Sequence, residues 1–493
     1  MSPQNRKILY VVSEIAPFAK TGGLADVSAA LPAHLHRRGH DVRVFVPLYS
    51  SIEVDAYDFA SVPGLGDVSV QIGTRSYDFS VYQATLTGTD LKIYFVHCPE
   101  LYDRANLYTS DEDEHRRFVL LTRAALEACQ RMQWAPDIAH AHDWQSALLP
   151  LYLKTIYAWD RLFQGTGTVL TIHNLGYQGI FPSTVLEDTG LAPAAHYLDA
   201  EDLRGGRIGF LKTGLLHADH ITTVSPTYAE EIVTERLGMG LGTLLQKRRD
   251  VLTGILNGVD TEVWNPREDP HLPFRYSVKS LWRKERCKEA LLEELSLPYE
   301  KHVPVIGMIT RLVSQKGIDL LEKVLPELLE RRDFRLVVLA SGEKRFETFF
   351  QKLQSDHPGK VCFYRGYHEQ LAHHIEGGAD MFLMPSRYEP CGLNQLYSLI
   401  YGTVPIVHRT GGLADTVQLW DPSDQTGTGI VFDHPTPEGV RWAIESALEQ
   451  HADRKAWQAL QKNGMAGDFS WESRIPEYEA VYEEILASKK AVV

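Results

Sequence analysis

The strongest constraint on the fold is a strand–helix–strand alternation that opens the chain and then recurs along it. Residues 7–13 (KILYVVS) form a short β-rich run, residues 24–37 have helical spacing of apolar side chains, and residues 41–47 (DVRVFVP) form the next β-rich run. Two strands joined through such a long crossover pair in parallel, since only a tight turn can make a hairpin. The opening of the chain therefore predicts a βαβ unit, and hence a parallel sheet covered by helices.

The alternation falls into two series, which a Gly/Asn-rich turn at residues 254–260 separates. The predicted strands of the first series continue at 96–98, 137–142, 167–174 and 219–225, and those of the second lie at 303–312, 334–341, 361–366, 381–386 and 403–409. A chain of 493 residues also exceeds the roughly 250–300 residues at which a single core stops growing. We expect an α/β protein with two doubly wound domains, residues 1–254 and 255–470, followed by an amphipathic helix at 471–493 that could pack on either.

Composition narrows the class of function. The chain carries 50 Lys and Arg against 64 Asp and Glu, a formal charge of −14, which argues against nucleic acid or an anionic membrane as the main partner. Its five cysteines are odd in number and form no CxxC, so neither a disulfide framework nor a cysteine zinc site is predicted. The N-terminus runs directly into a strand without a signal or transit pattern, and cytoplasm is the default expectation.

One motif occurs twice, once in each half. The sequence TGGLADV at residues 21–27 returns as TGGLADTV at residues 410–417, each time after an apolar strand and a basic residue and at the start of a helix. Paired glycines at a helix start let backbone N–H groups approach an anion. The alternative is a pair of tight strand-to-helix turns. Two copies in opposite domains favour a site that both domains share.

Residues that follow the predicted strands are the candidates for a ligand site, because ligands bind beyond the carboxyl ends of strands in open α/β sheets. The second half supplies cations and a glycine, Gly392, that is expected to start an apolar helix, which together suit a diphosphate: Arg311, Lys316, Tyr367, Ser386, Glu389 and Gly392. The first half supplies polar groups that suit a sugar: Lys20, Asp143, His173 and Asn174. For Arg311 and Lys316 the alternative is a pair of solvated cations, and for Glu389 a helix cap.

Two further patterns carry less weight. The sequence His140-Ala-His142-Asp143 has the look of a metal-ligand cluster, but the chain offers no second cluster at ligand spacing and no HExxH, so we expect no metal. Cys391 at a helix start would have a lowered thiol pKa, but we favour its interpretation as a small residue that packs near the donor.

Seven motifs in a fixed order resemble the bacterial glycogen synthases and plant starch synthases (glycosyltransferase family 5). They are KTGGLADV (20–27), HDW (142–144), TIHNLGYQG (171–179), ILNGVD (255–260), TRLVSQKG (310–317), RYEPCGLNQLY (387–397) and RTGGLADTV (409–417). The resemblance covers nearly the whole chain. It implies the GT-B architecture, with two Rossmann-like domains around a deep interdomain cleft and the helix at 471–493 returning to the first domain.

The resemblance also implies an activity. A member of this family is a hexosyltransferase of glycogen biosynthesis that moves glucose from ADP-glucose to the non-reducing end of an α-1,4-glucan, with retention of configuration and without a metal or other cofactor. Its partners would be ADP-glucose, ADP and glucans such as glycogen or maltooligosaccharides, in a bacterial cytoplasm. The preference for ADP-glucose over UDP-glucose rests on the resemblance alone, and nothing in the sequence indicates the oligomeric state.

Carried over position by position, the resemblance assigns roles to sixteen residues. The catalytic group would be His173, Asp143, Arg311, Lys316 and Glu389. The substrate-binding group would be Lys20, Gly23, Tyr108, Asn174, Asn257, Tyr367, Ser386, Cys391, Gly392, Leu393 and Asn394. In these roles Arg311 and Lys316 hold the diphosphate, Glu389 binds glucose hydroxyls and Tyr367 packs on adenine. Asp143 contacts the glucose or the acceptor, and a role as covalent nucleophile stays open for it. Asn394 stands where the commonest bacterial motif has Thr, which replaces a hydroxyl by an amide.

Three other readings compete with this one. Another retaining transferase of the same architecture would carry a second Glu eight positions after Glu389, where this chain has Tyr397. An α-glucan phosphorylase would need a pyridoxal-phosphate lysine near the C-terminus, and Lys489 and Lys490 lack that context. A non-catalytic glucan-binding scaffold would have lost catalytic residues, whereas all those expected are present.

Overall fold

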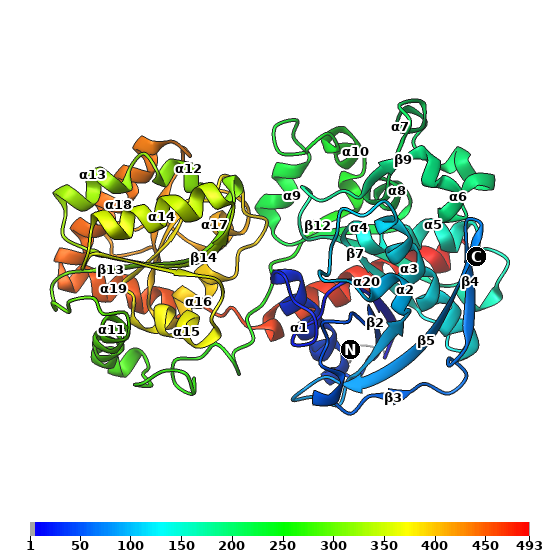
Figure 1. Ribbon diagram of the computed structural model, residues 1–493, viewed down its shortest axis with the longest axis horizontal. Helices are drawn as coiled ribbons and strands as arrows, with labels where there is room; N and C mark the ends of the chain where they lie inside the picture. The colour runs from blue at the N-terminus through cyan, green and yellow to red at the C-terminus, as the bar shows by residue number, and fades with distance from the viewer. Residues whose placement is uncertain (1–4, 493) are drawn as a thin grey trace. The chain divides into compact units, whose positions relative to one another are not determined.

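The computed structural model describes residues 5–492. The chain divides into two compact units. Unit 1 consists of Met1–Val224, Ala229–Asn257 and Trp471–Val493, and unit 2 consists of Ser225–Tyr228 and Gly258–Ser470. In each unit a central sheet is flanked by helices, which confirms the predicted α/β class (Figure 1).

Unit 1 contains a sheet in the order β12-β11-β8-β7-β1-β2-β6-β5-β3, with β4 paired to β5. The strands are β1 (Lys7–Val11), β2 (Asp41–Pro47), β3 (Ala60–Ser61), β4 (Val68–Ile72), β5 (Arg75–Thr85), β6 (Lys92–His97), β7 (Ile138–His142), β8 (Gly167–Ile172), β11 (His220–Thr223) and β12 (Leu252–Gly254). Neighbours from β12 to β6 are parallel. A separate antiparallel pair consists of β9 (Ile180–Pro182) and β10 (Arg207–Gly209).

The sequence analysis did not assign the antiparallel strands at the β6 edge of this sheet. Strand β5 pairs antiparallel with β6, β3 and β4. Along β4, buried and exposed residues alternate strictly, whereas every residue of β7 and β8 is buried. A strand with one solvated face has no continuous apolar run, so its sequence lacks the signal by which a buried parallel strand is recognised.

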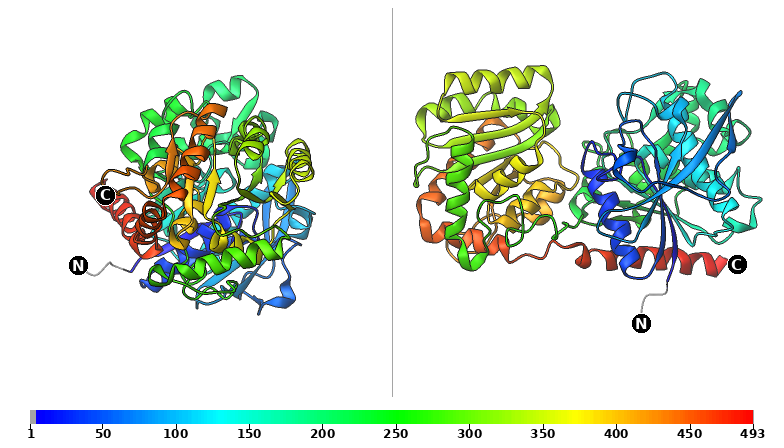
Figure 2. Two further views of the ribbon diagram at one scale, coloured as in Figure 1. Left: turned by 90° about the vertical axis from the view of Figure 1, so that its left-hand side faces the viewer. Right: turned by 60° about the horizontal axis from the view of Figure 1, so that its bottom comes forward.

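The helices of unit 1 cover both faces of this sheet. They are α1 (Gly23–Arg37), α2 (Pro99–Tyr102), α3 (Glu114–Arg131), α4 (Asp143–Ser146), α5 (Leu149–Lys154), α6 (Leu186–Thr189), α7 (Ala200–Arg204), α8 (Phe210–His217), α10 (Gly242–Lys247) and α20 (Ile475–Val492). Helix α9 (Pro226–Ile232) begins in the four residues that group with unit 2. The C-terminal helix α20 packs against β8 and α1 (Figure 2). In this packing the hydroxyl of Tyr482 lies 2.9 Å from Nδ1 of the buried His140.

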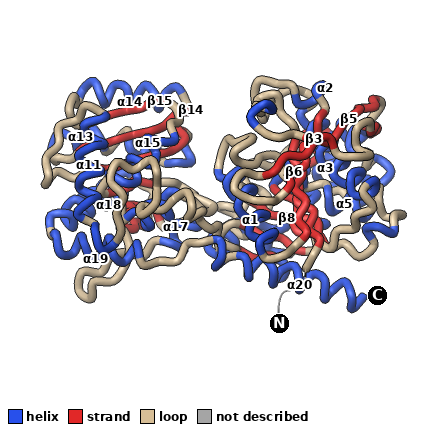
Figure 3. The backbone as a smooth tube through the Cα atoms, turned by 90° about the horizontal axis from the view of Figure 1, so that it is seen from below, coloured by secondary structure: helices blue, strands red, loops and turns tan. Residues whose placement is uncertain are grey.

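Unit 2 contains a fully parallel sheet in the order β15-β14-β13-β16-β17-β18. Figure 3 shows strands of this sheet, among them β14 and β15, in red with helices in blue around them. The strands are β13 (Val305–Leu312), β14 (Arg335–Gly342), β15 (Val361–Arg365), β16 (Met381–Met384), β17 (Val404–His408) and β18 (Ile430–Phe432). The helices are α11 (Trp282–Glu294), α12 (Ile318–Leu321), α13 (Leu325–Arg331), α14 (Lys344–Asp356), α15 (Glu369–Gly378), α16 (Asn394–Tyr401), α17 (Gly411–Thr416), α18 (Pro437–Ala452) and α19 (Arg454–Met465).

The core of unit 2 has two layers, one on each face of the sheet. Ile306 and Met308 of β13 join the apolar cluster that contains α12, α13, α14, α18 and α19 residues. Val305 and Ile309, which point to the opposite face, join the cluster with α11, α15 and α16 residues. Burial on both faces explains why these strands read as continuous apolar runs in the sequence.

A stack of three rings lies beside this core. The Trp264 ring is parallel to the ring of His373 at 3.9 Å on one side and to that of Tyr397 at 4.0 Å on the other. Nδ1 of the fully buried His373 lies 2.8 Å from Oδ2 of Asp269. Tyr397 therefore serves packing at the position where the competing transferases would have a second Glu.

Among residues 5–492, no helix is long and apolar enough to cross a membrane.

Candidate active-site groups

In unit 2, Lys316 and Glu389 meet at the carboxyl ends of the neighbouring strands β13 and β16. The Lys316 Nζ donates to Oε2 of Glu389 at 2.5 Å, and the Ser386 hydroxyl donates to the same oxygen at 2.9 Å. Glu389 is only 5% exposed and Ser386 only 1%. The two hydrogen bonds to Oε2 thus fix the position of this buried carboxylate.

The loops that carry these residues fit closely. Gly317 has a left-handed φ of 72°, and a Cβ there would overlap the carbonyl oxygen of Pro385. The backbone N–H of Arg387 donates to the carbonyl of Gln315 at 2.8 Å. Because the backbones touch, the turn after β13 sets the position of Lys316 relative to the loop after β16.

The second TGGLAD copy supports this loop. A Cβ on Gly411 would overlap the Glu389 carbonyl oxygen, and a Cβ on Gly412 would overlap that of Cys391. The N–H of Gly412 donates to the carbonyl oxygens of Glu389 and Pro390, both at 3.2 Å. The hypothesis that the glycine N–H groups approach a ligand therefore fails at Gly412, whose N–H is used within the protein.

The segment from Cys391 to Asn394 leads into α16. The helix begins at Asn394 and not at Gly392 as the sequence suggested, since Gly392 adopts a left-handed φ of 73°. Leu393 occupies the cap position without a side-chain cap. The Asn394 side-chain amide donates to the Ile309 carbonyl at 2.8 Å, which ties the helix start to β13. The buried Cys391 packs under this turn, where Gln395 donates to its carbonyl at 3.0 Å.

Arg311 lies near the carboxyl end of β13, and Tyr367 lies two residues after the end of β15. In the sheet, β14 lies between these two strands. The Arg311 side chain is exposed. Tyr367 is 59% exposed, and its hydroxyl donates to Glu369 at 2.7 Å. An exposed ring at a strand end is open to stacking with a planar ligand.

In unit 1, Asp143, His173 and Asn174 meet at the ends of the neighbouring strands β7 and β8. Oδ1 of Asp143 accepts from the backbone N–H of His173 at 2.7 Å and from that of Asn174 at 3.4 Å. Asp143 has a φ of 50°, rare for a residue other than glycine. A Cβ on Gly179 would overlap the Trp144 ring, so the HDW and LGYQG motifs pack directly on each other.

The titration properties of this cluster follow from burial. Burial raises the pKa of Asp143 to about 7, although the two backbone N–H groups oppose the rise and the nearby Glu14 adds to it. Burial lowers the pKa of His173 to about 3. Its Nε2 lies 3.0 Å from Nδ1 of His142, so the two neutral imidazoles share one proton in a hydrogen bond.

The first TGGLAD copy lies at the end of β1, next to β7 in the sheet. Gly23 begins α1, and Lys20 donates to Asp26 of that helix at 2.7 Å. The Tyr108 hydroxyl donates to Oε1 of Glu14 at 2.5 Å. The sequence analysis missed Glu14. In the sequence, Glu14 is a carboxylate that directly follows the β-rich run at residues 7–13, and this was the signal that could have identified it.

Asn257 is the last residue of unit 1 before the chain enters unit 2. It is only 6% exposed, and its Oδ1 has no hydrogen-bond partner among the described residues. An unsatisfied buried oxygen is costly unless a ligand or water completes it.

Comparison with known proteins decides the family. Residues 7–247 match the model of the starch synthase catalytic domain, and residues 296–464 match that of the group 1 glycosyl transferases. A glycogen synthase of Geotalea daltonii is 42% identical over 98% of this chain and 99% of its own length. One of Anaeromyxobacter dehalogenans is 44% identical over 97% and 99%. The chain belongs to the glycogen and starch synthase family.

A solved structure of this family shows the same fold. The catalytic domain of starch synthase IV from Arabidopsis thaliana, bound to ADP and acarbose, matches with a TM-score of 0.91 and 33% identity over 98% of this chain and all of that one. The protein is accordingly a glycosyltransferase with the GT-B fold. This confirms the family, the fold and the enzyme class that the seven motifs indicated.

The histidines that looked like metal ligands have other partners. Nδ1 of His140 lies 2.9 Å from the Tyr482 hydroxyl, and Nε2 lies 2.6 Å from Oγ1 of Thr171. Across residues 5–492, no group of three or more His, Cys, Asp or Glu has the geometry to hold a metal ion.

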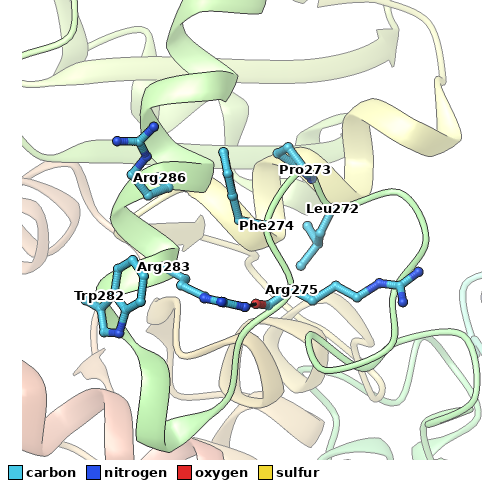
Figure 4. Close-up of a pocket in the computed structure, with 7 residues that line it drawn as sticks. All are labelled: Leu272, Pro273, Phe274, Arg275, Trp282, Arg283 and Arg286. Carbon is cyan, nitrogen blue, oxygen red and sulfur yellow. Dashed lines mark hydrogen bonds between the residues drawn. The ribbon is translucent and has the colours of Figure 1, made fainter.

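A pocket of about 530 Å³ on unit 2 contains none of the predicted site residues. Its lining consists of Leu272, Pro273, Phe274, Arg275, Trp282, Arg283 and Arg286. The guanidinium groups of Arg275 and Arg286 point in different directions and do not converge on a common point (Figure 4). The family's motif residues lie instead at the strand ends described above.

Proposed function

We propose that this protein lengthens an α-1,4-glucan by transferring glucose from ADP-glucose to its non-reducing end, with retention of configuration and without a metal. The observation that carries the proposal is the hydrogen-bonded group of Lys316, Ser386 and Glu389 at the ends of β13 and β16, in a chain that matches glycogen synthases over almost its whole length. The ADP bound to the plant relative supports an adenine nucleotide as the donor.

The donor residues are those of unit 2. Departure of ADP builds negative charge on a phosphate, and Arg311 and Lys316 stabilise that charge together with the uncapped start of α16. Glu389 accepts hydrogen bonds from glucose hydroxyls with its remaining lone pairs, while Tyr367 stacks on the adenine. Ser386, Cys391, Gly392, Leu393 and Asn394 shape the loop around the diphosphate.

Unit 1 supplies the groups that face the sugar. His173 is neutral near pH 7 because burial lowers its pKa, so it acts as a hydrogen-bond partner of the glucose and not as a cation. Asp143, with a pKa near 7, accepts a hydrogen bond from the glucose or the acceptor hydroxyl. Lys20, Gly23, Tyr108, Asn174 and Asn257 complete the sugar and phosphate contacts.

We infer a front-face displacement in which the leaving phosphate accepts the proton of the acceptor hydroxyl. In this scheme preorganised cations do the work that a metal ion does in other transferases. Attack by Asp143 to form a covalent intermediate is the second candidate, because burial raises its pKa and its carboxylate lies at the strand ends. The hypothesis of an α-glucan phosphorylase has less support. It would need a lysine that holds pyridoxal phosphate, whereas Nζ of Lys489 forms an ion pair with Asp219 at 3.0 Å.

The proposed partners are ADP-glucose and glycogen or maltooligosaccharides, and the proposed location is the bacterial cytoplasm. Incorporation of labelled glucose into glycogen from ADP-glucose and, in parallel, from UDP-glucose tests the proposal, with EDTA present in both reactions. We expect fast incorporation from ADP-glucose alone. Transfer mainly from UDP-glucose would refute the donor, and an activity that needs an added divalent metal would refute the metal-free scheme.

Two variants test the phosphate assignment. We expect Arg311→Ala and Lys316→Ala each to lower kcat/KM by about 100-fold, which corresponds to about 2.7 kcal/mol of transition-state stabilisation. Lys323→Ala, which removes an exposed lysine seven residues after Lys316, is the matched control and should stay near the wild-type rate. Near-normal rates in both variants would contradict the role of these cations.

A further inference from the structure

We propose that Glu14 is a positioning residue for the donor. Its carboxylate binds Thr21 and thereby fixes the position of the turn from Lys20 to Gly23. The inference rests on the proposed function, because that function gives Lys20 and Gly23 their contacts with the phosphates and the glucose. Glu14 itself need not touch the substrate.

Glu14 is a buried carboxylate that bonds to an exposed turn. It is 3% exposed and follows β1 by three residues. Oε2 accepts from the backbone N–H of Thr21 at 2.5 Å, and Oε1 accepts from the Thr21 hydroxyl at 2.7 Å. Both donors of a single residue are thus bound by the two oxygens of a single carboxylate, which fixes the position and the orientation of that residue.

Thr21 lies between the two residues whose placement matters. Lys20 precedes it, and α1 begins two residues later at Gly23. The N-terminus of α1 has Gly22 at the cap position and no side-chain cap, so no side chain of the helix itself anchors its start. Glycines at 22 and 23 would leave this turn free to vary. The contact with Glu14 removes that freedom.

Tyr108 ties a second loop to the same carboxylate. Its hydroxyl donates to Oε1 of Glu14 at 2.5 Å and lies 2.8 Å from Oγ of Ser13. Glu14 therefore joins β1, the Lys20–Gly23 turn and the loop that carries Tyr108. Burying a carboxylate costs free energy unless hydrogen bonds compensate it, and three charge-assisted bonds do so here.

A positioning role makes a specific kinetic prediction. If Glu14 acts through the donor-binding turn, its loss should weaken the use of ADP-glucose and leave the use of glucan unchanged. A merely structural role would reduce the amount of folded enzyme, and therefore the apparent kcat, without raising KM for one substrate selectively.

The test compares Glu14→Gln with Tyr49→Phe. The glutamine keeps the size of the side chain but removes its charge and replaces one carboxylate oxygen by an NH2 group, which then faces either the Thr21 N–H or the hydroxyls of Thr21 and Tyr108. Tyr49→Phe is the matched control, because it removes an equally buried hydrogen bond, from the Tyr49 hydroxyl to the Ser13 carbonyl at 2.9 Å, without touching the turn. Thr21→Val removes only the hydroxyl bond and serves as a milder variant in case Glu14→Gln folds poorly.

We expect Glu14→Gln to raise KM for ADP-glucose by about tenfold or more, with KM for glycogen within about twofold of wild type. Thr21→Val should show a smaller rise of the same kind, and Tyr49→Phe should show none. Equal KM values for ADP-glucose in wild type, Glu14→Gln and Thr21→Val would overturn the positioning role while leaving the proposed function intact. A wild-type protein that transfers no glucose from ADP-glucose would instead overturn both.

Discussion

The side-chain nitrogen of Lys316 and Oε2 of Glu389, 73 residues apart in the chain, lie 2.5 Å from each other. Two charges at this distance on rigid loops should act as one unit. We therefore expect Lys316→Ala and Glu389→Ala to be non-additive: the double variant should lose less transition-state stabilisation than the sum of the single losses, by about 1 kcal/mol or more. The measurement is a double-mutant cycle on kcat/KM for ADP-glucose. Strict additivity would show that the two residues act independently.

Asp143 should make the stability of unit 1 depend on pH. Burial raises its pKa to about 7, whereas the unfolded value is near 4. The native state then binds the extra proton between these values, so its stabilising contribution is full below about pH 4 and is lost as the pH rises through 7. Asp143→Asn keeps the acceptor for the His173 N–H but does not titrate.

We expect the free energy of unfolding of Asp143→Asn, relative to that of wild type, to be about 2–4 kcal/mol higher at pH 8 than at pH 5. Thermal melting at both pH values measures this difference. A constant difference across the range would mean that Asp143 titrates normally.

His373 should make unit 2 lose stability at alkaline pH. Burial alone would lower its pKa, but the Asp269 and Glu369 carboxylates outweigh burial and raise it to about 9. Asp269 lies at 2.8 Å and Glu369 at 3.8 Å, with the ring of Trp264 stacked on one face and His271 nearby. A raised histidine pKa stabilises fully below about 6.5, and the contribution is lost as the pH rises through 9.

The variant that tests this dependence is Asp269→Asn. We expect wild type to lose about 2 kcal/mol between pH 7 and pH 9.5 from this site, and Asp269→Asn to be less stable at pH 7 but to lose little more on alkalisation. Glu369→Gln, at the more distant and exposed carboxylate, should show a smaller change. Parallel pH profiles for all three proteins would refute the assignment.

Alanine at the first glycine of each TGGLAD copy, Gly22 or Gly411, should change stability by different amounts. Gly411 has a φ of 42°, and a Cβ there would overlap the Glu389 carbonyl, whereas a Cβ on Gly22 would meet no atom within 4 Å. We expect Gly411→Ala to lose about 2 kcal/mol or more of stability and Gly22→Ala less than about 1 kcal/mol, measured by denaturant unfolding. Equal losses would mean that the close approach at Gly411 relaxes easily.

The alternation of strands and helices predicted the α/β class, and the seven motifs in their order indicated the family. Residues after neighbouring parallel strands come together by geometry alone, which is why Lys316 could be expected near Glu389, and Asp143 near His173. The carboxyl ends of parallel strands lie at one edge of the sheet, so the strand positions alone place these residues at the same edge.

Contacts that cross a turn or a loop were not accessible in this way. The bond from Thr21 to Glu14 follows from the path of residues 15–20, which has no periodic signature. Repetition of TGGLAD indicated one common role. The structure instead gives Gly412 a packing role against Cys391, because a close backbone approach leaves the same glycine signal as a ligand site. The start of α16 was misplaced by two residues, since the left-handed φ of Gly392 delays it.

The placement of α20 has a consequence for biosynthesis. Unit 1 takes its last segment, Trp471–Val493, from the far end of the chain, and Tyr482 in that segment contacts His140 in the middle of the first sheet. A ribosome releases domains from the N-terminus onwards, and each usually folds as it emerges. Here unit 1, most of which is translated first, lacks helix α20 until residues 475–492 have left the ribosome, whereas unit 2, complete at Ser470, can fold before it. Until α20 is available, the part of β8 that it contacts stays exposed in nascent unit 1. A chaperone would be of most use at this stage of synthesis.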